Sequence, residues 1–326
     1  MFRMKTQNHA FVAQIAYEAF AACTSIVVEG KDGHPLHIRT MDWEMPQLQP
    51  LTVEIDYVQR GQVLFRATTW AGYIGVLTGV RPGAFSVSVN YRRTEMMNEQ
   101  PLKAFAKNLQ RGLARHWPVS FLVRAALERC GSYRTACETL QQAGLIAPTY
   151  LTVCGVSPGE GCILSRDREG SIDGSCVEAQ LSDGATPLVQ TNIDCWRCAP
   201  SAAASGGHEW QDICQSRRRR AFALKALATD SGRRRGRGAG AGLAAPGAPK
   251  THSMEDLWLL MSMAPTLAHD TVYTVAMEPK TGELVTRVEV TAAQKQAARR
   301  RYGAVRVSRS EVGGGGGGGA SGATRQ

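Results

Sequence analysis

Two neighbouring stretches decide the fold of this chain: Ala22-Cys23-Thr24-Ser25-Ile26-Val27 and His37-Ile38-Arg39-Thr40-Met41-Asp42-Trp43. A small residue precedes Cys23 and a β-branched run follows it, which predicts a thiol at the start of a strand. A nearby guanidinium stabilises a thiolate, and a carboxylate can accept and donate a proton beside it. Cutting the chain before Cys23 would also free an α-amine, whose pKa of about 7.7–8.0 suits a general base. The pattern therefore predicts a cysteine nucleophile served by Arg39 and Asp42.

These two stretches resemble the start of the catalytic chain in the acid ceramidase and N-acylethanolamine acid amidase family. Members of that family are N-terminal-nucleophile hydrolases related to the choloylglycine (bile-salt) hydrolases. The resemblance continues in the same order over roughly residues 10–290, through segments 50–53, 70–79, 159–168, 190–196 and 272–274. Residues 71–83 are more similar to the ceramidase branch than to the ethanolamide branch.

The resemblance implies an α+β fold, the four-layer αββα sandwich of the N-terminal-nucleophile hydrolases, and it implies roles for the site residues. Cys23 would attack an amide carbonyl to give a thioester. Arg39 would hold the thiolate and the carbonyl region of the substrate. Asp42 would hydrogen-bond the freed α-amine and tune its pKa. Asn192 would be a neutral donor in the oxyanion hole.

One position departs from the family pattern. Ceramidase-like enzymes have Asn-Glu-Arg where this chain has Asn90-Tyr91-Arg92. A phenol, with a pKa of about 10, cannot replace a carboxylate anion at neutral pH, but Tyr91 can still donate a hydrogen bond. Related bile-salt hydrolases use an asparagine in this region, so Asn90 is a second candidate. Arg219 and Arg220 match a pair of arginines in the family, one of which would help to order the site. We name Arg220 as the candidate for this role.

The resemblance implies an amidohydrolase that acts on a fatty-acid amide, in the first place the N-acyl bond of a ceramide-like lipid. The apolar side chains of Trp43, Trp70 and Tyr73 could line the substrate pocket. An N-acylethanolamine amidase is the alternative within the class. An inactive, truncated homologue that binds lipid or an acidic partner is the alternative of another class. Expected partners are a lipid amide, a membrane surface and, after self-cleavage, the small chain.

Composition is that of a globular enzyme, with 43% hydrophobic residues in 326. The formal net charge of +10 comes largely from arginines clustered within residues 217–237. Residues 231–250 are rich in Gly, Ala and Arg, which predicts a solvated, disordered insertion rather than a nucleic-acid site. No apolar run reaches the roughly 18 residues that a transmembrane helix needs.

The nine cysteines are too few and too scattered for a disulfide scaffold. Cys195-Trp196-Arg197-Cys198 is a lone CxxC, which His208 and Cys214 complement only loosely. A structural zinc site needs four well-spaced ligands, so ordinary thiols or one local disulfide is the better interpretation. We expect no metal and no cofactor.

Residues 1–22 allow two interpretations. Basic residues and an apolar run before Cys23 would suit a secretory or bacterial lipoprotein signal, but Gln14, Tyr17 and Glu18 interrupt the run and no clear signal peptide is predicted. The resemblance implies instead a remnant of the small chain or propeptide, shorter than in family members, so this N-terminus is either truncated or reduced. By resemblance, the compartment is the lysosome or another acidic or secretory one.

The remaining pattern predicts a catalytic domain over residues 23–295 and a basic, Gly-rich disordered tail over 296–326. Alternating and β-branched runs predict strands at 24–29, 37–41, 51–57, 62–69, 84–90, 150–154, 162–165, 188–192, 271–277 and 284–291. Helical spacing predicts helices at 119–128, 133–143 and 254–262. Strands, then helices, then strands is an α+β order.

Overall fold

The computed structural model describes residues 22–92, 94, 100–170, 177–181, 187–194, 208–233, 251–289, 292–303, 305 and 307. Its strands are β1 (Ala22–Glu29), β2 (Pro35–Asp42), β3 (Thr52–Gln59), β4 (Gln62–Trp70), β5 (Thr78–Arg81), β6 (Phe85–Tyr91), β7 (Thr149–Cys154), β8 (Gly161–Arg166), β9 (Val177–Gln180), β10 (Leu188–Gln190), β11 (Thr271–Glu278) and β12 (Glu283–Arg287). Its helices are η1 (Pro46–Leu51, 3₁₀), α3 (Pro101–Leu113), α4 (Val119–Arg129), α5 (Tyr133–Gln142), α6 (His208–Arg233), α7 (Met254–Met261) and α8 (Ala292–Tyr302).

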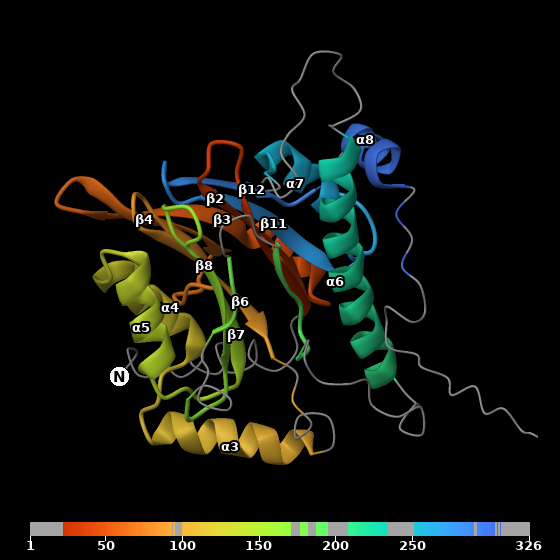
Figure 1. Cartoon of the computed structure of the whole chain (residues 1–326). Helices are drawn as coiled ribbons and strands as arrows, with labels where there is room; N and C mark the ends of the chain where they lie inside the picture. Colours follow the sequence, from red (N-terminus) through yellow and green to blue (C-terminus); the bar gives the residue numbers. More distant parts are fainter. Residues whose placement is uncertain are drawn as a thin grey trace, which may run out of the picture.

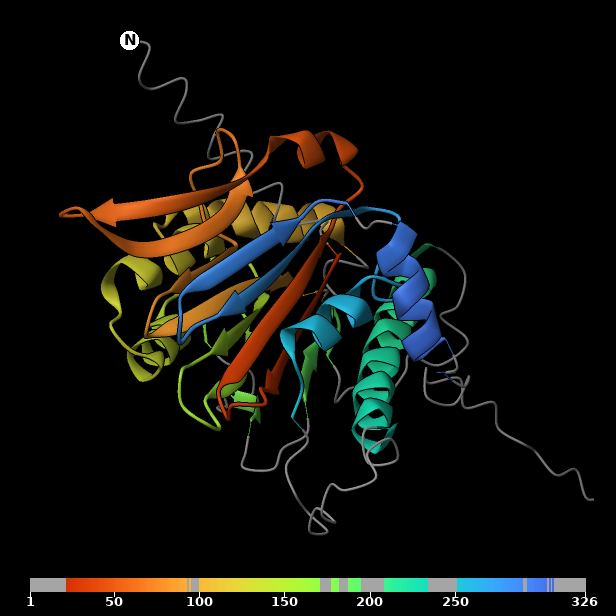
Figure 2. The same ribbon diagram turned by 90° about the horizontal axis from the view of Figure 1, so that it is seen from above.

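The strands form two antiparallel sheets that pack face to face. One sheet has the order β10-β1-β2-β11-β12, and the other has the order β3-β4-β5-β6-β7-β8-β9. Helices α4 and α5 cover the outer face of the larger sheet, and α6, α7 and α8 cover the outer face of the smaller one (Figures 1 and 2). The predicted four-layer αββα sandwich is confirmed.

Side chains alternate strictly along β1, and the two faces of the strand pack against different layers. The strand is therefore buried on both faces. Cys23, Ser25 and Val27 point toward the larger sheet. Thr24 and Ile26, between them, point toward the helical layer that contains α6. The register Cys23↔Met41 and Ser25↔Arg39 carries the same alternation into β2. Cys23, at an odd position, is thus placed between the two sheets.

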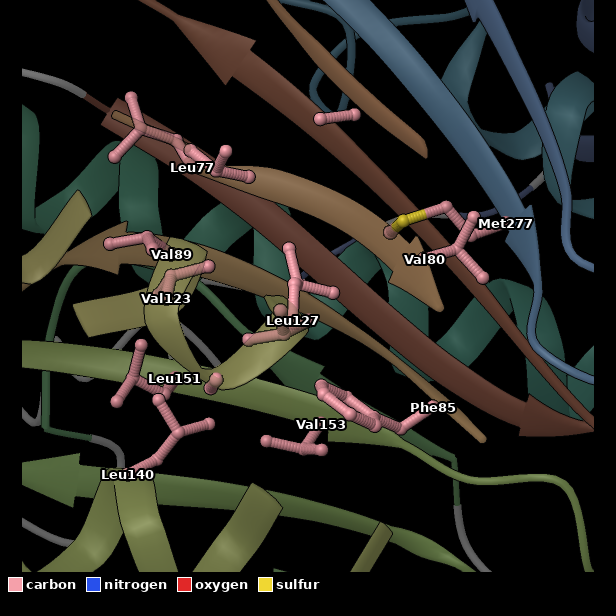
Figure 3. Packing of buried hydrophobic residues seen from close by; sticks show 14 of the residues in the cluster. Leu77, Val80, Phe85, Val89, Val123, Leu127, Leu140, Leu151, Val153 and Met277 are labelled. Atoms are coloured by element: carbon pink, nitrogen blue, oxygen red, sulfur yellow. The ribbon is translucent and has the colours of Figure 1, made fainter. Parts of the chain in front are cut away.

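The largest core cluster runs from the smaller sheet through the larger one to α4 and α5. Figure 3 shows Val123 and Leu127 of α4 in one cluster with Val80 of β5, Val89 of β6 and Leu77, which directly precedes β5. Gly79 allows this close approach, because a Cβ atom there would lie 2.7 Å from the Leu127 side chain and 2.9 Å from the Arg66 carbonyl oxygen. The glycine in β5 is therefore a packing requirement.

Most predicted elements are present, with shifted ends. The segments predicted as strands at 24–29, 37–41, 51–57, 62–69 and 84–90 correspond to β1, β2, β3, β4 and β6. The three predicted helices correspond to α4, α5 and α7. Helix α3, helix α6 and strand β5 were not predicted.

The first residues of two segments that were predicted to be disordered are helical in the structure. Residues 231–233 belong to the last turn of α6, and the rest of the predicted insertion lies outside the described residues. The tail was predicted from residue 296, but α8 continues to Tyr302. Tyr302 is buried and donates a hydrogen bond to the Asp256 carbonyl oxygen, and Arg301 pairs with the Asp256 carboxylate. These contacts with α7 stabilise a helix that its polar composition alone does not predict.

Residues 1–21, which the sequence assigns to the small chain, lie outside the described residues, as does the CxxC at 195–198. Among the helices that the structure describes, none is both long and apolar enough to cross a bilayer.

Candidate active site

Cys23 lies at the start of β1, fully buried between the sheets. Arg39 Nη2 donates a hydrogen bond to Cys23 Sγ at 3.1 Å. The Met41 thioether is 3.9 Å from the same sulfur. A guanidinium in contact with a thiol favours the thiolate, which is the nucleophilic form. The predicted pairing of Cys23 with Arg39 is therefore present in the structure.

Arg39 is itself held rigidly, although it is a fully buried cation. Its Nη1 donates to Thr78 Oγ1 at 3.0 Å and to the Tyr273 hydroxyl at 3.1 Å. Its Nη2 also donates to the Val89 carbonyl oxygen at 2.6 Å. Burial raises the pKa of Tyr273, although the Arg39 charge acts in the opposite direction. The two sheets together fix the guanidinium beside the sulfur.

Asn192 follows β10 and contacts the main chain of the nucleophile. Its Oδ1 accepts from the Cys23 backbone N–H at 2.8 Å and from Arg219 Nη2 at 2.9 Å. Its Nδ2 donates to the Tyr91 carbonyl oxygen at 2.9 Å. The atom that faces Cys23 is thus an acceptor, whereas an oxyanion hole needs donors. The predicted proximity to Cys23 is present, and in the uncut chain these contacts orient the Cys23 nitrogen; the oxyanion role of Asn192 stays a prediction.

Arg219 and Arg220 make different contacts in the structure. Arg219 Nη1 donates to the Cys23 carbonyl oxygen at 2.9 Å, to Thr24 Oγ1 at 2.9 Å and to Asp42 Oδ2 at 3.0 Å. Arg220 instead donates from Nε to the Val189 carbonyl oxygen at 3.2 Å. Successive helical residues point about 100° apart, so only one member of the pair can face β1. Arg219 is thus the member of the pair that contacts Cys23, and a role of Arg220 in the site stays a prediction.

Asp42 is buried beneath Arg219 rather than exposed in a turn. Thr271 Oγ1 donates to Asp42 Oδ1 at 2.7 Å, and Thr40 Oγ1 donates to Oδ2 at 3.3 Å. Burial raises the pKa of Asp42 to about 6, against the opposing charge of Arg219. Arg219 donates both to the Asp42 carboxylate and to the Cys23 carbonyl oxygen, so it links Asp42 to Cys23.

Asn90 and Tyr91 contribute to the structure around the site in ways that the sequence did not predict. Asn90 Nδ2 donates to the carbonyl oxygens of Gln190 at 3.0 Å and Thr191 at 3.3 Å, and its Oδ1 accepts from Ser25 Oγ at 2.6 Å. The Tyr91 side chain is buried, and its carbonyl oxygen is the acceptor for Asn192. Asn90 thus connects β6 to the end of β10 by hydrogen bonds.

A buried polar chain continues from Asn90 away from the thiol. Ser25 Oγ lies 2.8 Å from Ser88 Oγ, and His37 joins Ser88 to Ser86 through its two ring nitrogens, each at 2.9 Å. Burial and the nearby charge of Arg39 lower the pKa of His37 to about 3. His37 is therefore neutral at ordinary pH and links the two sheets as a hydrogen-bonding residue.

The predicted aromatic residues form one connected group beside the site. Ring centroids are 5.8 Å apart for Trp43 and Trp70, 5.4 Å for Trp70 and Tyr73, and 5.9 Å for Trp70 and Tyr273. Tyr273 also contacts Arg39, and Arg39 contacts the thiol, so Arg39 connects this aromatic group to the thiol. Trp43 and Tyr73 are partly exposed and Trp70 is buried, so the group runs from the surface inward.

Sequence reasoning missed three residues of the site: Thr78, Arg219 as the chosen arginine, and Tyr273. Tyr273 belonged to a segment of the resemblance, which was the available signal. Across the described part of the chain, no three His, Cys, Asp or Glu side chains come together in a way that could hold a metal ion.

Comparison with known proteins gives one consistent result. The family model described as "Linear amide C-N hydrolases, choloylglycine hydrolase family" matches residues 23–177, so the match begins at the proposed nucleophile. Acid ceramidases of Heterocephalus glaber and Homo sapiens are each 38% identical over 197 residues, which are 56% of this chain and 48% of the relative. This chain thus spans about half the length of the curated relatives it matches.

A solved structure agrees with these matches. The Caenorhabditis elegans N-acylethanolamine-hydrolyzing acid amidase (NAAA) ortholog has a TM-score of 0.59 and 25% sequence identity, covering 82% of this chain and 100% of that one. The resemblance predicted from the sequence is therefore confirmed: this chain is similar to the acid ceramidases and N-acylethanolamine acid amidases, N-terminal-nucleophile hydrolases related to the choloylglycine hydrolases.

Proposed function

We propose that this chain is a cysteine amidohydrolase that cuts its own Ala22–Cys23 bond and then hydrolyses the amide bond of N-acylated lipids. The observation that carries the proposal is the fixation of Cys23 on three sides. Arg39 contacts its sulfur, Asn192 contacts its nitrogen and Arg219 contacts its carbonyl oxygen. Holding the reacting atoms in a fixed geometry is the requirement for nucleophilic catalysis.

Self-cleavage would use the same sulfur. Cys23 Sγ attacks the carbonyl carbon of Ala22, the acyl group moves from nitrogen to sulfur, and water hydrolyses the resulting thioester. The products are a carboxylate on Ala22 and a free α-amine on Cys23. Asn192 Oδ1, which accepts from the Cys23 N–H in the uncut chain, would continue to orient that nitrogen.

Lipid hydrolysis would then follow in two steps. The freed amine accepts the proton of the Cys23 thiol, and the thiolate attacks the amide carbonyl of the substrate. The leaving amine takes up a proton, and the acyl group remains on sulfur as a thioester. Water, deprotonated by the α-amine, releases the fatty acid. Arg39 stabilises the thiolate at the beginning and end of the cycle.

The substrate we favour is a ceramide-like lipid. The curated relatives that are 38% identical are named acid ceramidases, whereas the amidase ortholog among the solved structures is 25% identical. The aromatic group around Trp70 supplies an apolar surface beside the thiol. An N-acylethanolamine is the second candidate, because both substrate classes share the acyl chain and differ in the leaving amine.

Helix α3 supports the proposed contact with a membrane surface. Leu102, Phe105, Leu109 and Leu113 recur at helical spacing and are all exposed, with Leu102 at 84% and Leu113 at 77%. Such an apolar stripe on an exposed helix is the pattern of interfacial binding. A lipid substrate in an acidic compartment, such as the lysosome, would be reached from this side.

The test begins with maturation. The purified chain and its Cys23→Ala variant are incubated at pH 4.5 and pH 7.5 and analysed by intact mass and N-terminal sequencing. We expect a new chain beginning at Cys23 in the wild type alone. A chain that stays whole at both pH values would contradict the proposal and favour a binding role.

The matured protein is then offered a ceramide and an N-acylethanolamine with the same acyl chain, and the released fatty acid is measured by mass spectrometry. A higher kcat/KM for the ceramide supports the favoured substrate. A higher value for the ethanolamide supports the second candidate. Self-cleavage without release of fatty acid from either substrate would reject lipid amides as the substrate class.

A further inference from the structure

Two cysteines outside the candidate active site lie next to each other. Cys137 Sγ of α5 is 3.5 Å from Cys162 Sγ of β8. Cys162 is buried in the main core, whereas Cys137 is partly exposed on its helix. None of the contacts that build the site around Cys23 uses either residue, so the pair needs a separate explanation.

The chemistry around the pair distinguishes its two members. A hydrogen bond from Cys137, and a further one from Tyr133, lower the pKa of Cys162 against the opposing effect of burial. The hydrogen bond to Cys162, followed by burial, raises the pKa of Cys137. The buried sulfur is thus the better thiolate of the pair, and the partly exposed sulfur is the one that a dissolved reagent can reach.

We propose that Cys137 and Cys162 are a covalent cross-linking site, at which exchange with a low-molecular-weight disulfide such as glutathione disulfide forms a bond that fastens α5 to β8. In the first step Cys137 passes its proton to the neighbouring Cys162 sulfur and attacks one sulfur of glutathione disulfide, and the glutathione thiolate that is released takes up that proton from Cys162. In the second step the Cys162 thiolate attacks the Cys137 sulfur of the mixed disulfide and displaces the second glutathione. Two protein thiols are oxidised and one glutathione disulfide is reduced to two glutathione molecules.

The geometry selects this pair over the other described cysteines nearby. A disulfide has an S–S distance of about 2.05 Å, so the two sulfur atoms need to approach by about 1.5 Å. Cys130 Sγ instead contacts Thr139 Oγ1 at 3.3 Å, and Cys154 Sγ contacts the Gly155 carbonyl oxygen at 3.7 Å. Each of these two sulfur atoms thus has an oxygen atom as its hydrogen-bond partner.

The cross-link would have a defined structural effect. Helix α5 contacts β7 and β8 on the outer face of the larger sheet. A bond from Cys137 to Cys162 closes a loop of the chain and restricts the unfolded state. We therefore expect the oxidised protein to be more resistant to unfolding, with no change in the position of Cys23.

The experiment uses the full-length protein. It is equilibrated in buffers of defined glutathione to glutathione disulfide ratio, its remaining thiols are trapped with N-ethylmaleimide, and it is digested with trypsin and a glutamate-specific protease. Cleavage after Arg134, Glu138, Glu160 and Arg166 places Cys137 in fragment 135–138, Cys154 in 139–160 and Cys162 in 161–166. We expect fragments 135–138 and 161–166 to be linked and to separate on reduction.

Matched variants decide the result. Cys137→Ala and Cys162→Ala should abolish the linked fragments, and Cys130→Ala should retain them. The melting temperature of the wild type and of Cys130→Ala should rise by several degrees on oxidation, while that of Cys137→Ala should not. Trapped thiols at both positions in the most oxidising buffer, stable glutathione on Cys137, or fragment 139–160 in the link would each overturn the proposal. The redox titration uses the wild type alone, so it tests the proposal even if a variant does not fold.

Discussion

Arg92 and Asp194 form a two-point ion pair, with Arg92 Nε donating to Oδ1 at 2.7 Å and Nη2 donating to Oδ2 at 2.8 Å. Both side chains are buried, and the Tyr150 hydroxyl also donates to Asp194 Oδ1 at 2.5 Å. The pair completes a row of contacts in which Asn90, Tyr91 and Arg92 each hold part of segment 190–194. The end of β6 thereby positions Asn192 against Cys23.

Replacement of Asp194 by Asn should be strongly destabilising. It leaves the Arg92 cation buried without its anionic partner, which costs about 3–5 kcal/mol when a buried pair is broken. Urea unfolding measures the loss. The control is Asp56→Asn, which removes the partly exposed pair between Asp56 and Arg66 and should cost less than about 1 kcal/mol. Equal effects of the two substitutions would contradict the bracing role of Arg92 and Asp194.

The neighbouring arginines 219 and 220 provide a matched test of the site. Arg219→Lys replaces a planar fork with a single ammonium group, which cannot contact the Cys23 carbonyl oxygen, Asp42 and Asn192 together. We expect self-cleavage to slow on the order of 10- to 100-fold. Arg220→Lys should leave the rate within about twofold, since the hydrogen bond of Arg220 goes to the Val189 carbonyl oxygen of β10. Gel densitometry over time measures both rates, and equal slowing would show that the pair acts through general stability.

By resemblance, Tyr91 stands where ceramidase-like enzymes have a glutamate, and it contacts Asn192 through its main-chain carbonyl oxygen. Tyr91→Phe keeps that carbonyl oxygen and most of the buried area. We therefore expect self-cleavage within about threefold of the wild type and a stability loss of about 1 kcal/mol. Time courses at pH 4.5 and urea unfolding check the two values. A loss of more than tenfold in rate at nearly unchanged stability would assign the phenol a direct chemical role.

His37 should make the folded state sensitive to acid. Its folded pKa of about 3 lies below the unfolded value of 6.5, so the unfolded chain binds the proton first. The stability that neutral His37 provides is complete above pH 6.5 and is lost as the pH falls toward 3. Between pH 7 and pH 5 the loss is about 2 kcal/mol. The stability difference between wild type and His37→Gln should shrink by about that amount in urea unfolding.

Local patterns predicted most of the strands, whereas the four-layer arrangement came from the family resemblance. Alternation along β1 and β2 and the order of Cys23, Arg39 and Asp42 are visible without tertiary structure, and the role of Cys23 as nucleophile stays a prediction. Helix α6 was not predicted, so the sequence did not indicate which of its arginines faces β1. The direction of the Asn192 amide depends on Tyr91 and Arg219, which lie 101 and 27 residues away in sequence. Such orientations follow from packing and cannot be predicted from one segment.

The pH dependence of stability at Asp42 shows whether burial or the charge of Arg219 has the larger effect on the pKa of its carboxyl group. Burial disfavours its carboxylate, and the charge of Arg219 at 3.0 Å favours it. With a folded pKa of about 6 above the unfolded value of 3.8, the stabilising contribution of Asp42 is complete below pH 3.8 and is lost as the pH rises through 6. The stability of the wild type relative to Asp42→Asn should therefore fall between pH 4 and pH 7, by on the order of 1–3 kcal/mol.

Urea unfolding of both proteins at pH 4, 5, 6 and 7 measures that difference. Because Asn mimics the protonated carboxyl group, the two proteins should be most alike in charge at pH 4 and diverge as the wild type ionises. If the wild type instead gains stability relative to the variant as the pH rises, the ion pair with Arg219 outweighs burial, and Asp42 is ionised at the pH of an acidic compartment. That result would make the Asp42 carboxylate a permanent partner of the arginine that contacts Cys23.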